Sequence, residues 1–376
     1  MVDTETFYNA MRDAGIGFFA GVPDSLLSPL CACVATHAPD GEHCITANEG
    51  AAVALAAGNY LAQGNPALVY MQNSGLGNAI NPLLSLADDS VYGIPMLLLI
   101  GWRGEPGVKD EPQHLAQGGA TVPLLEAMGI THHRLPADTG AAISLLEHAR
   151  KQTMEQRKPV VILAGEKAFT PYSSQCDSGE HDLPLAREEA IRVLLESIEP
   201  RTTVVSATGM ISRELYELRE QMEEGHDHDF LSVGSMGHCC QIALGIALAK
   251  PDRRVFCLDG DGSALMHMGS MAITAQSGAA NLAHIVLNNG SHASVGGQPT
   301  CGFQISFADI ARGCGYQSVR TVVDGQGIRD FMSEIKADAG PTFLEIRVHR
   351  GSRADLGRPG MSLSEQKENF MRHLEG

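Results

Sequence analysis

Short apolar runs alternate with longer segments of helical periodicity along the whole chain. Ala67–Gln72, Val255–Leu258 and Leu282–Leu287 have the length and composition of buried strands. Thr4–Gly15 and Arg187–Ser197 instead repeat apolar residues at the spacing of amphipathic helices. Strands that alternate with helices in this way predict a mostly parallel sheet that is covered by helices on both faces.

One polar segment, residues 167–184, interrupts the alternation; it is rich in Pro, Ser, Asp and Gly and has little periodicity. Such a composition is typical of a linker between domains. The chain of 376 residues is long enough for two domains with complete cores. We therefore predict an α/β protein with two doubly wound parallel-sheet domains, residues 1–168 and 186–376, joined by a linker over residues 169–185 and without a middle domain.

The acidic composition limits the partners that the chain can bind. Its formal net charge of −17 argues against nucleic acid or an anionic membrane as a partner. The longest apolar run, Ile94–Gly101, is far shorter than the roughly 18 residues of a membrane-spanning helix. The polar start, Met1–Thr6, does not have the pattern of a signal peptide. An anionic small molecule fits as a substrate only if cationic side chains gather locally.

The nine cysteines are scattered, and most lie in apolar segments. Cys31 and Cys33 lack the spacing of a zinc site, and so do Cys239 and Cys240. We therefore expect reduced core thiols in a cytoplasmic protein. The His-Asp-His segment 226–228 has a metal-like composition, but we interpret it as a solvated loop.

Two polar motifs follow neighbouring strands of the second domain. Gly260-Asp261-Gly262 comes after Val255–Leu258, and Asn288-Asn289 comes after Leu282–Leu287, with a helix expected between them over Met266–Gln276. The carboxyl ends of parallel strands meet at the same edge of a sheet, where ligands bind. A carboxylate, a carboxamide and carbonyls are hard oxygen ligands that suit Mg²⁺ held against a phosphate-bearing cofactor. Since Gly-Asp-Gly alone is more often an ordinary acidic turn, the prediction depends on the pair of motifs.

The paired motif resembles the signature of the thiamine diphosphate (ThDP)-dependent decarboxylases, in which Gly-Asp-Gly is followed by Asn-Asn. The resemblance implies that Asp261, Asn289 and the backbone carbonyl of Ser291 bind Mg²⁺, and that the metal holds the diphosphate. It also implies cofactor contacts from the neighbours of the aspartate, which are Gly260, Gly262 and Ser263.

Glu49 is the candidate catalytic carboxylate of the first domain. It opens an Ala-rich helix within Asn48-Glu49-Gly50. A carboxylate at this position could instead serve only the helix dipole. In the family that the chain resembles, a buried glutamate hydrogen-bonds the aminopyrimidine of ThDP and promotes formation of the thiazolium ylide. The resemblance therefore gives Glu49 a catalytic and a cofactor-binding role.

The loop Gly234-Ser235-Met236 follows a predicted strand and opens a helix, where small residues leave backbone N–H groups free for a diphosphate. In the family a bulky apolar residue of this loop bends the cofactor, and Met236 occupies that place. Thr208-Gly209, after the first strand of the second domain, is a further diphosphate candidate. The family binds ThDP between domains of two subunits, which implies a homodimer or a higher homo-oligomer.

Several loops resemble one branch of this family, the phosphonopyruvate decarboxylases, across nearly the whole chain. They are GVPDSL from Gly21, NSGLGN from Asn73, EPQH from Glu111, HASVGGQPT from His292 and the carboxyl-terminal Arg353–Pro359. The resemblance implies non-oxidative decarboxylation of 3-phosphonopyruvate to phosphonoacetaldehyde and carbon dioxide, in phosphonate biosynthesis. The sulfopyruvate decarboxylases are near relatives that are usually built from two chains, so the single chain favours the phosphonate.

A 2-oxo acid with a second anionic group needs hydrogen-bond donors in its pocket. The candidates are His292, Arg353 and Arg358 as cationic donors and Ser25 and Gln113 as neutral donors. His114 and His292 are the candidate catalytic histidines, with His114 as the proton donor. Three of the candidates also have ordinary interpretations. Arg353 and Arg358 could be solvated surface charges, and His114 could be a loop histidine without a catalytic role.

Three other functions stay open. Sulfopyruvate decarboxylation differs only in the head group. A ThDP carboligase of the acetolactate-synthase type usually carries a middle flavin-binding domain, for which the length leaves no room. A non-catalytic protein of this fold would be expected to lose the glutamate or a metal ligand, yet Glu49, Asp261 and Asn289 are all present.

Overall fold

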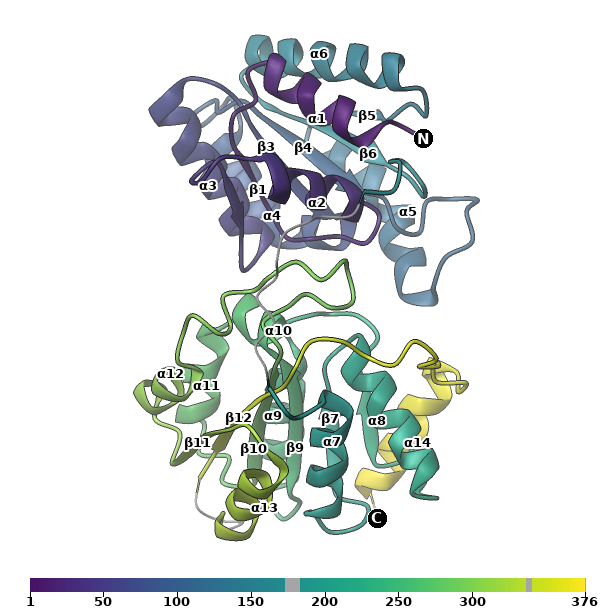
Figure 1. Cartoon of the computed structure of the whole chain (residues 1–376), viewed down its shortest axis with the longest axis vertical. Helices are drawn as coiled ribbons and strands as arrows, with labels where there is room; N and C mark the ends of the chain where they lie inside the picture. The colour runs from purple at the N-terminus through teal and green to yellow at the C-terminus, as the bar shows by residue number, and fades with distance from the viewer. Residues whose placement is uncertain (173–182, 336–339, 376) are drawn as a thin grey trace. The chain divides into compact units, whose positions relative to one another are not determined.

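The chain divides into two compact units, each built around one six-stranded sheet (Figure 1). All neighbouring strands in both sheets pair in parallel, as the alternation of runs predicts. The computed structural model describes residues 1–172, 183–335 and 340–375. The first unit comprises Met1–Ser178 and Val295–Gln298, and the second comprises Gly179–Ser294 and Pro299–Gly376. Most of the predicted linker, residues 173–182, lies outside the described residues.

The first unit has the strand order β2-β1-β3-β4-β6-β5. Its strands are β1 (Phe19–Gly21), β2 (His43–Ile45), β3 (Ala67–Gln72), β4 (Met96–Gly101), β5 (Thr131–Arg134) and β6 (Pro159–Ala164). Its helices are α1 (Thr4–Asp13), α2 (Ser28–His37), α3 (Glu49–Gln63), α4 (Leu76–Pro82), α5 (Pro112–Ala127) and α6 (Thr139–Gln156), with short turns at η1 (Asn73–Gly75) and η2 (Leu83–Ala87).

Side chains of this sheet alternate between two helical layers, as the pleat requires. In β3, Leu68 and Tyr70 belong to the core under α1, α2 and α6, whereas Val69 and Met71 belong to the core under α3, α4 and α5. All residues of β4 are buried. Burial on both faces explains why these strands are continuous apolar runs in the sequence rather than alternating ones.

The second unit has the strand order β11-β12-β10-β9-β7-β8. Its strands are β7 (Thr203–Ser206), β8 (Asp229–Leu231), β9 (Val255–Gly260), β10 (Leu282–Asn288), β11 (Ser318–Val322) and β12 (Thr342–Arg347). Its helices are α7 (Arg187–Glu196), α8 (Met210–Gln221), α9 (Cys239–Ala249), α10 (Asp261–Met266), α11 (Gly269–Gln276), α12 (Phe307–Cys314), α13 (Gly325–Glu334) and α14 (Leu363–Glu375).

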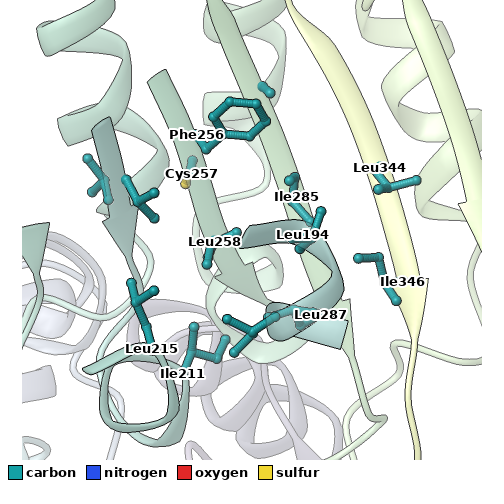
Figure 2. Close-up of a cluster of buried hydrophobic side chains, with 14 of the residues drawn as sticks. Leu194, Ile211, Leu215, Phe256, Cys257, Leu258, Ile285, Leu287, Leu344 and Ile346 are labelled. Carbon is teal, nitrogen blue, oxygen red and sulfur yellow. The ribbon is translucent and has the colours of Figure 1, made fainter. Parts of the chain in front are cut away.

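The larger core of the second unit lies between its central strands and the helices that cover them. In β10, Ile285 and Leu287 point into this core, and Val286 points to the smaller core under α10, α11 and α12. Figure 2 shows the larger core, with Phe256, Cys257 and Leu258 of β9, Ile285 and Leu287 of β10, Leu344 and Ile346 of β12, and Leu194, Ile211 and Leu215 of the covering helices. In the described ranges, each helix is too short or too polar to cross a lipid bilayer.

The helix expected over Met266–Gln276 is wrong in its start and its continuity. Two helices occupy this region, and α10 begins at Asp261 itself. The backbone leaves the helical region at His267, where φ is −131° and ψ is 48°. Asp261 is therefore the first residue of a helix that follows directly on β9, so its backbone is fixed by both elements. Helix α12 was not anticipated from the sequence.

Segment 226–228 is a loop between α8 and β8, as expected, but the expectation that its histidines are solvated is wrong. His228 is 0% exposed, and the ring of His226 stacks on Tyr216 with a centroid separation of 3.9 Å. The Nε2 atom of His226 lies 2.5 Å from a carboxylate oxygen of Glu220. Both partners belong to α8, so the tertiary packing of that helix buries the segment.

A buried arginine links α8 to β8. Arg219 is 1% exposed, and its guanidinium donates to both carboxylate oxygens of Asp229, at 3.0 and 3.1 Å. Glu224 accepts a further bond from the same guanidinium. Burial raises the pKa of Asp229 although Arg219 opposes that shift. The aspartate therefore depends on this arginine to stay charged inside the unit.

We expect Arg219→Met to lower the free energy of unfolding by about 3–5 kcal/mol, because Asp229 would remain buried without its partner. Urea denaturation followed by circular dichroism measures this change. Lys151→Met is the matched control, because Lys151 and Glu155 form an exposed pair at 3.6 Å, and its loss costs about 0.5 kcal/mol or less. Equal losses in the two variants would contradict the assignment.

Candidate functional site

Asp261 and Asn289 follow neighbouring strands at the same edge of the second sheet. β9 ends at Gly260 and β10 ends at Asn288, and the strand register pairs Leu287 with Gly260. Asp261 is 2% exposed and Asn289 is 3% exposed. The parallel register therefore brings the predicted carboxylate and carboxamide to one place, as expected for the carboxyl ends of parallel strands.

Burial raises the pKa of Asp261 to about 6, although the Thr300 hydroxyl and backbone groups of Asn289 favour its charged form. The Asn289 side-chain oxygen accepts a hydrogen bond from the Ser291 N–H at 3.1 Å, which orients the amide. A desolvated carboxylate beside an amide oxygen and backbone carbonyls is a set of hard ligands that a divalent cation would stabilise. The oxygen ligands of Asp261 and Asn289 therefore fit Mg²⁺.

Two residues of this edge escaped the sequence reasoning. The Thr300 hydroxyl donates to Asp261. Gly302 lies so close that a Cβ atom there would come within 2.8 Å of the Asp261 Oδ2 atom and 2.6 Å of the Asn288 Oδ1 atom. Asn288 itself donates to the Gly302 carbonyl and to Glu345, both at 2.8 Å, so it fixes the loop rather than offering a free ligand. Thr300 is the last residue of the HASVGGQPT loop and Gly302 follows it closely, but no spacing rule points to either residue as a contact of Asp261.

The predicted diphosphate loop lies against the same edge. Ser235 has a φ of +53°, which is uncommon for a residue other than glycine and typical of functional sites. The Gly237 N–H donates to the Ser263 hydroxyl at 3.1 Å. A Cβ atom on Gly262 would lie 3.4 Å from the Met236 side chain. The structure therefore groups Ser235, Met236, Gly262 and Ser263 around the amino-terminal end of α10.

His292 and Gly209 complete this group. A Cβ atom on Gly262 would lie 2.9 Å from the His292 ring, and one on Gly209 would lie 3.5 Å from Ser294. Gly209 precedes α8 with a φ of +99°, and Thr208 is half-buried beside it. Burial lowers the pKa of His292 to about 4, so its imidazole is neutral at pH 7 and the expectation of a cationic donor at this position is wrong.

The two carboxyl-terminal arginines lie in different surroundings from one another. The Arg353 guanidinium is paired with Glu188 at 2.9 Å, with Asp355 at 3.0 Å and with Glu217. Arg358 is exposed. Three carboxylates neutralise Arg353 in this arrangement, so substrate binding by Arg353 requires an exchange of partners.

The first unit carries Glu49 at the start of α3. Glu49 is 5% exposed, and its Oε2 atom accepts a hydrogen bond from the Asn78 side chain at 2.8 Å. The Asn48 side chain caps the helix by accepting from the Ala51 N–H at 2.9 Å. A Cβ atom on Gly75 would lie only 2.1 Å from the Glu49 Oε1 atom. Glycine at position 75 therefore makes room for the carboxylate.

The first unit holds a second buried carboxylate, Asp24, within the GVPDSL loop. Asp24 is 0% exposed, and a Cβ atom on Gly101 would lie 1.9 Å from its Oδ2 atom. That oxygen accepts from the Leu26 N–H at 3.0 Å, and Oδ1 has no hydrogen-bond partner among the described residues. Burial raises the pKa of Asp24 to about 6, against the Leu26 N–H and the Arg103 charge, which lower it. Perturbed carboxyls of this kind are concentrated in functional sites.

Arg103 connects Asp24 to the predicted substrate residues. Its guanidinium donates to the Ser25 hydroxyl at 3.1 Å and to both carboxylate oxygens of Asp110, at 2.8 and 2.5 Å. His114 lies in the first turn of α5 next to Gln113, and its pKa is lowered by burial and by Arg103. The position of Arg103 in a polar loop is only a weak signal in the sequence, and the contact with Ser25 identifies the residue.

Comparison with known proteins places both halves in one group. Residues 3–123 match the family described as "Thiamine pyrophosphate enzyme, N-terminal TPP binding domain", and residues 207–346 match its "C-terminal TPP binding domain". A phosphonopyruvate decarboxylase of Streptomyces hygroscopicus is 34% identical over 98% of this chain and 93% of its own. One of Streptomyces viridochromogenes is 33% identical over 98% and 94%.

A sulfopyruvate decarboxylase of Methanosarcina acetivorans is 28% identical over 99% of this chain and 97% of its own. That relative spans both halves of the chain, so a single chain does not separate the phosphonate branch from the sulfonate branch. The number of chains therefore does not favour the phosphonate, whereas the higher identity to the phosphonopyruvate decarboxylases does.

We expect Asp24→Asn to raise the free energy of unfolding at pH 7.5 by about 2 kcal/mol more than at pH 4.5. The pKa of Asp24 is about 6 in the folded chain and near 3.8 otherwise. Its ionisation therefore destabilises the fold as the pH rises from about 4 to about 6, and the penalty persists above that. Urea denaturation at the two pH values measures the difference. An equal effect at both values would contradict it.

Proposed function

The chain belongs to the thiamine pyrophosphate enzymes and, within them, to the phosphonopyruvate decarboxylase family, and we propose that it converts 3-phosphonopyruvate to phosphonoacetaldehyde and carbon dioxide in phosphonate biosynthesis. The observation that carries the proposal is the near full-length relationship combined with a buried Glu49 in one unit and a buried Asp261–Asn289 pair in the other. When bound, ThDP would supply a nucleophilic carbon for the keto group and a thiazolium ring that serves as the electron sink for decarboxylation.

The roles in cofactor binding follow from two groups of residues, one around Glu49 in the first unit and one around Asp261 in the second. Glu49, oriented by Asn78, would hydrogen-bond the aminopyrimidine and support its proton transfer. Asp261, Asn289 and the Ser291 carbonyl would hold Mg²⁺. Met236 would set the bend of the cofactor. The diphosphate would contact backbone and hydroxyl donors around α8, α9 and α10, which are Thr208, Gly209, Gly234, Ser235, Gly260, Gly262 and Ser263.

The substrate's anionic groups would need hydrogen-bond donors and cationic partners. Ser25, Gln113, Arg353 and Arg358 are the proposed binding residues, with His114 and His292 as catalytic histidines. Arg103 joins this set, because its guanidinium is held by Asp110 and already contacts the Ser25 hydroxyl. His114 would donate a proton in its imidazolium form, and the lowered pKa that burial and the Arg103 charge cause makes that form a stronger acid.

We further propose a homodimer or a higher homo-oligomer. Glu49 and the metal ligands belong to different units, and related enzymes bind ThDP between domains of two subunits. The domains would be residues 1–168 for the pyrimidine and 186–376 for the diphosphate, with residues 169–185 as the linker. A cytoplasmic location is supported by the described cysteines, which are all free thiols.

Sulfopyruvate decarboxylation is the second candidate function, because a full-length relative carries that name. It requires the same cofactor geometry and differs in the head group. A carboligase of the acetolactate-synthase type is less well supported, because the described residues form two units and leave no middle domain.

We expect Glu49→Gln to lower turnover by about 100-fold or more while ThDP and Mg²⁺ stay bound, because a proton-transfer contact is lost and the metal ligands are intact. Carbon dioxide release measures turnover, and calorimetry measures cofactor binding. Asp261→Ala is the contrasting variant and should lose retention of ThDP. Unchanged turnover in Glu49→Gln, or normal ThDP binding in Asp261→Ala, would refute the corresponding role.

Phosphonopyruvate should be decarboxylated in preference to sulfopyruvate and pyruvate. The test offers each 2-oxo acid to the protein with ThDP and Mg²⁺ and follows aldehyde and carbon dioxide. Preference for sulfopyruvate would reassign the head group and keep the mechanism. Failure to release aldehyde from any of the three would overturn decarboxylation.

A further inference from the structure

A buried cluster of cysteine and histidine side chains lies inside the second unit, on the strands β9 and β10 that precede Asp261 and Asn289. The register of β9 and β10 pairs Cys257 with His284. Neighbours in register point to the same face of a sheet, so both side chains face the same way, and Asp259 follows Cys257 on that face. Helix α9 covers this face and brings Cys239 and Cys240 at its first turn.

The ligand atoms are close enough to share one ion. The Cys240 Sγ, Cys257 Sγ and one His284 ring nitrogen all lie within 4.8 Å of one another. The Cys240 Sγ is 3.6 Å from the His284 Nδ1 atom. Zinc–sulfur and zinc–nitrogen bonds of about 2.3 and 2.0 Å in a tetrahedral site place neighbouring ligands about 3.5–3.8 Å apart. The cluster is therefore near the geometry of a bound metal without large movement.

The surroundings of His284 prepare its Nδ1 atom for a metal. Its other nitrogen, Nε2, lies 3.3 Å from the Asp259 carboxylate, and such a carboxylate partner is typical of metal-binding histidines. The Tyr316 hydroxyl is 3.2 Å from Nδ1 and is the nearest oxygen donor for a fourth position. Both cysteines, Cys240 and Cys257, would bind the metal as thiolates.

We propose that Cys240, Cys257 and His284 bind a thiophilic divalent metal ion, with zinc as the expected occupant. Two thiolates neutralise the charge of a divalent ion, so the filled site adds no net charge to a core where Cys257 and His284 are 0% and 1% exposed. Sulfur and imidazole ligands select zinc-like ions over Mg²⁺, which prefers the oxygen ligands around Asp261.

The metal would join three elements of the second unit. Cys240 belongs to α9, Cys257 to β9 and His284 to β10, and Figure 2 shows Cys257 within the core of this unit. β9 and β10 lead directly into Asp261 and Asn289, so the site would brace the strands that present the Mg²⁺ ligands. This role is structural and does not depend on which 2-oxo acid the enzyme accepts.

The experiment measures metal content rather than turnover. Untagged full-length protein, purified under reducing conditions, is analysed for zinc by mass spectrometry, and metal-free protein is titrated with Co²⁺ and followed by absorption. We expect about one equivalent of zinc per chain and a thiolate-to-cobalt charge-transfer band with tetrahedral visible bands. Cys257→Ser and His284→Gln should each lower metal affinity at least about 10-fold.

Two control variants test whether the metal binds at this cluster. Cys33→Ser removes an equally buried thiol of the first unit and should leave metal content unchanged. Asp261→Ala should lose ThDP but keep zinc, so failure of the cofactor assignment and failure of the zinc site are distinguishable. The wild-type Co²⁺ spectrum needs no variant, so it remains decisive if a substitution unfolds the chain. Absence of the charge-transfer band, or equal zinc in wild type and folded Cys257→Ser, would overturn the proposal.

Discussion

The parallel register of β9 with β10 is the constraint on which the second unit depends. It pairs Leu287 with Gly260, and the metal candidates Asp261 and Asn289 follow within two residues of this pair. A shift by one residue would turn every side chain of the strand to the opposite face. Asp261 would then leave Asn289, and Cys257 would leave His284. The backbone hydrogen bonds between β9 and β10 thus place Asp261 near Asn289 and Cys257 next to His284.

Buried carboxylates are the main electrostatic cost of the two half-sites. Asp24 and Asp261 both have pKa values raised to about 6 by burial, and neither is neutralised by a close bidentate arginine. Arg219 and Asp229 show the contrasting solution, in which a buried acid is fully paired. A buried carboxylate with few hydrogen-bond or ion-pair partners destabilises the ligand-free fold. Such a carboxylate favours the binding of a ligand that stabilises its negative charge. This difference in pairing separates buried acids that stabilise the structure from buried acids that are available to bind a cofactor or substrate.

Glycines make these acids possible, because they remove the atom that would occupy the same space. Positions 75, 101 and 302 each place a hydrogen where a Cβ atom would collide with Glu49, Asp24 or Asp261. All three lie in segments distant in sequence from the acid concerned. Each half-site is therefore specified by a pair of residues, a carboxylate and a facing glycine, rather than by the carboxylate alone.

The sequence by itself determined most of the elements, the two parallel sheets and the residues that signal ThDP and Mg²⁺, but it did not predict α12 or the break between α10 and α11. Periodicity and short motifs are local, so β3, β9, β10 and the Gly-Asp-Gly and Asn-Asn pair could be predicted directly. Only the tertiary structure decided which distant residues meet. The contacts of Arg103 with Ser25, of Thr300 with Asp261 and of Cys240 with His284 join segments far apart in the chain. Such contacts depend on sheet register and helix packing, which leave no fixed spacing in the sequence.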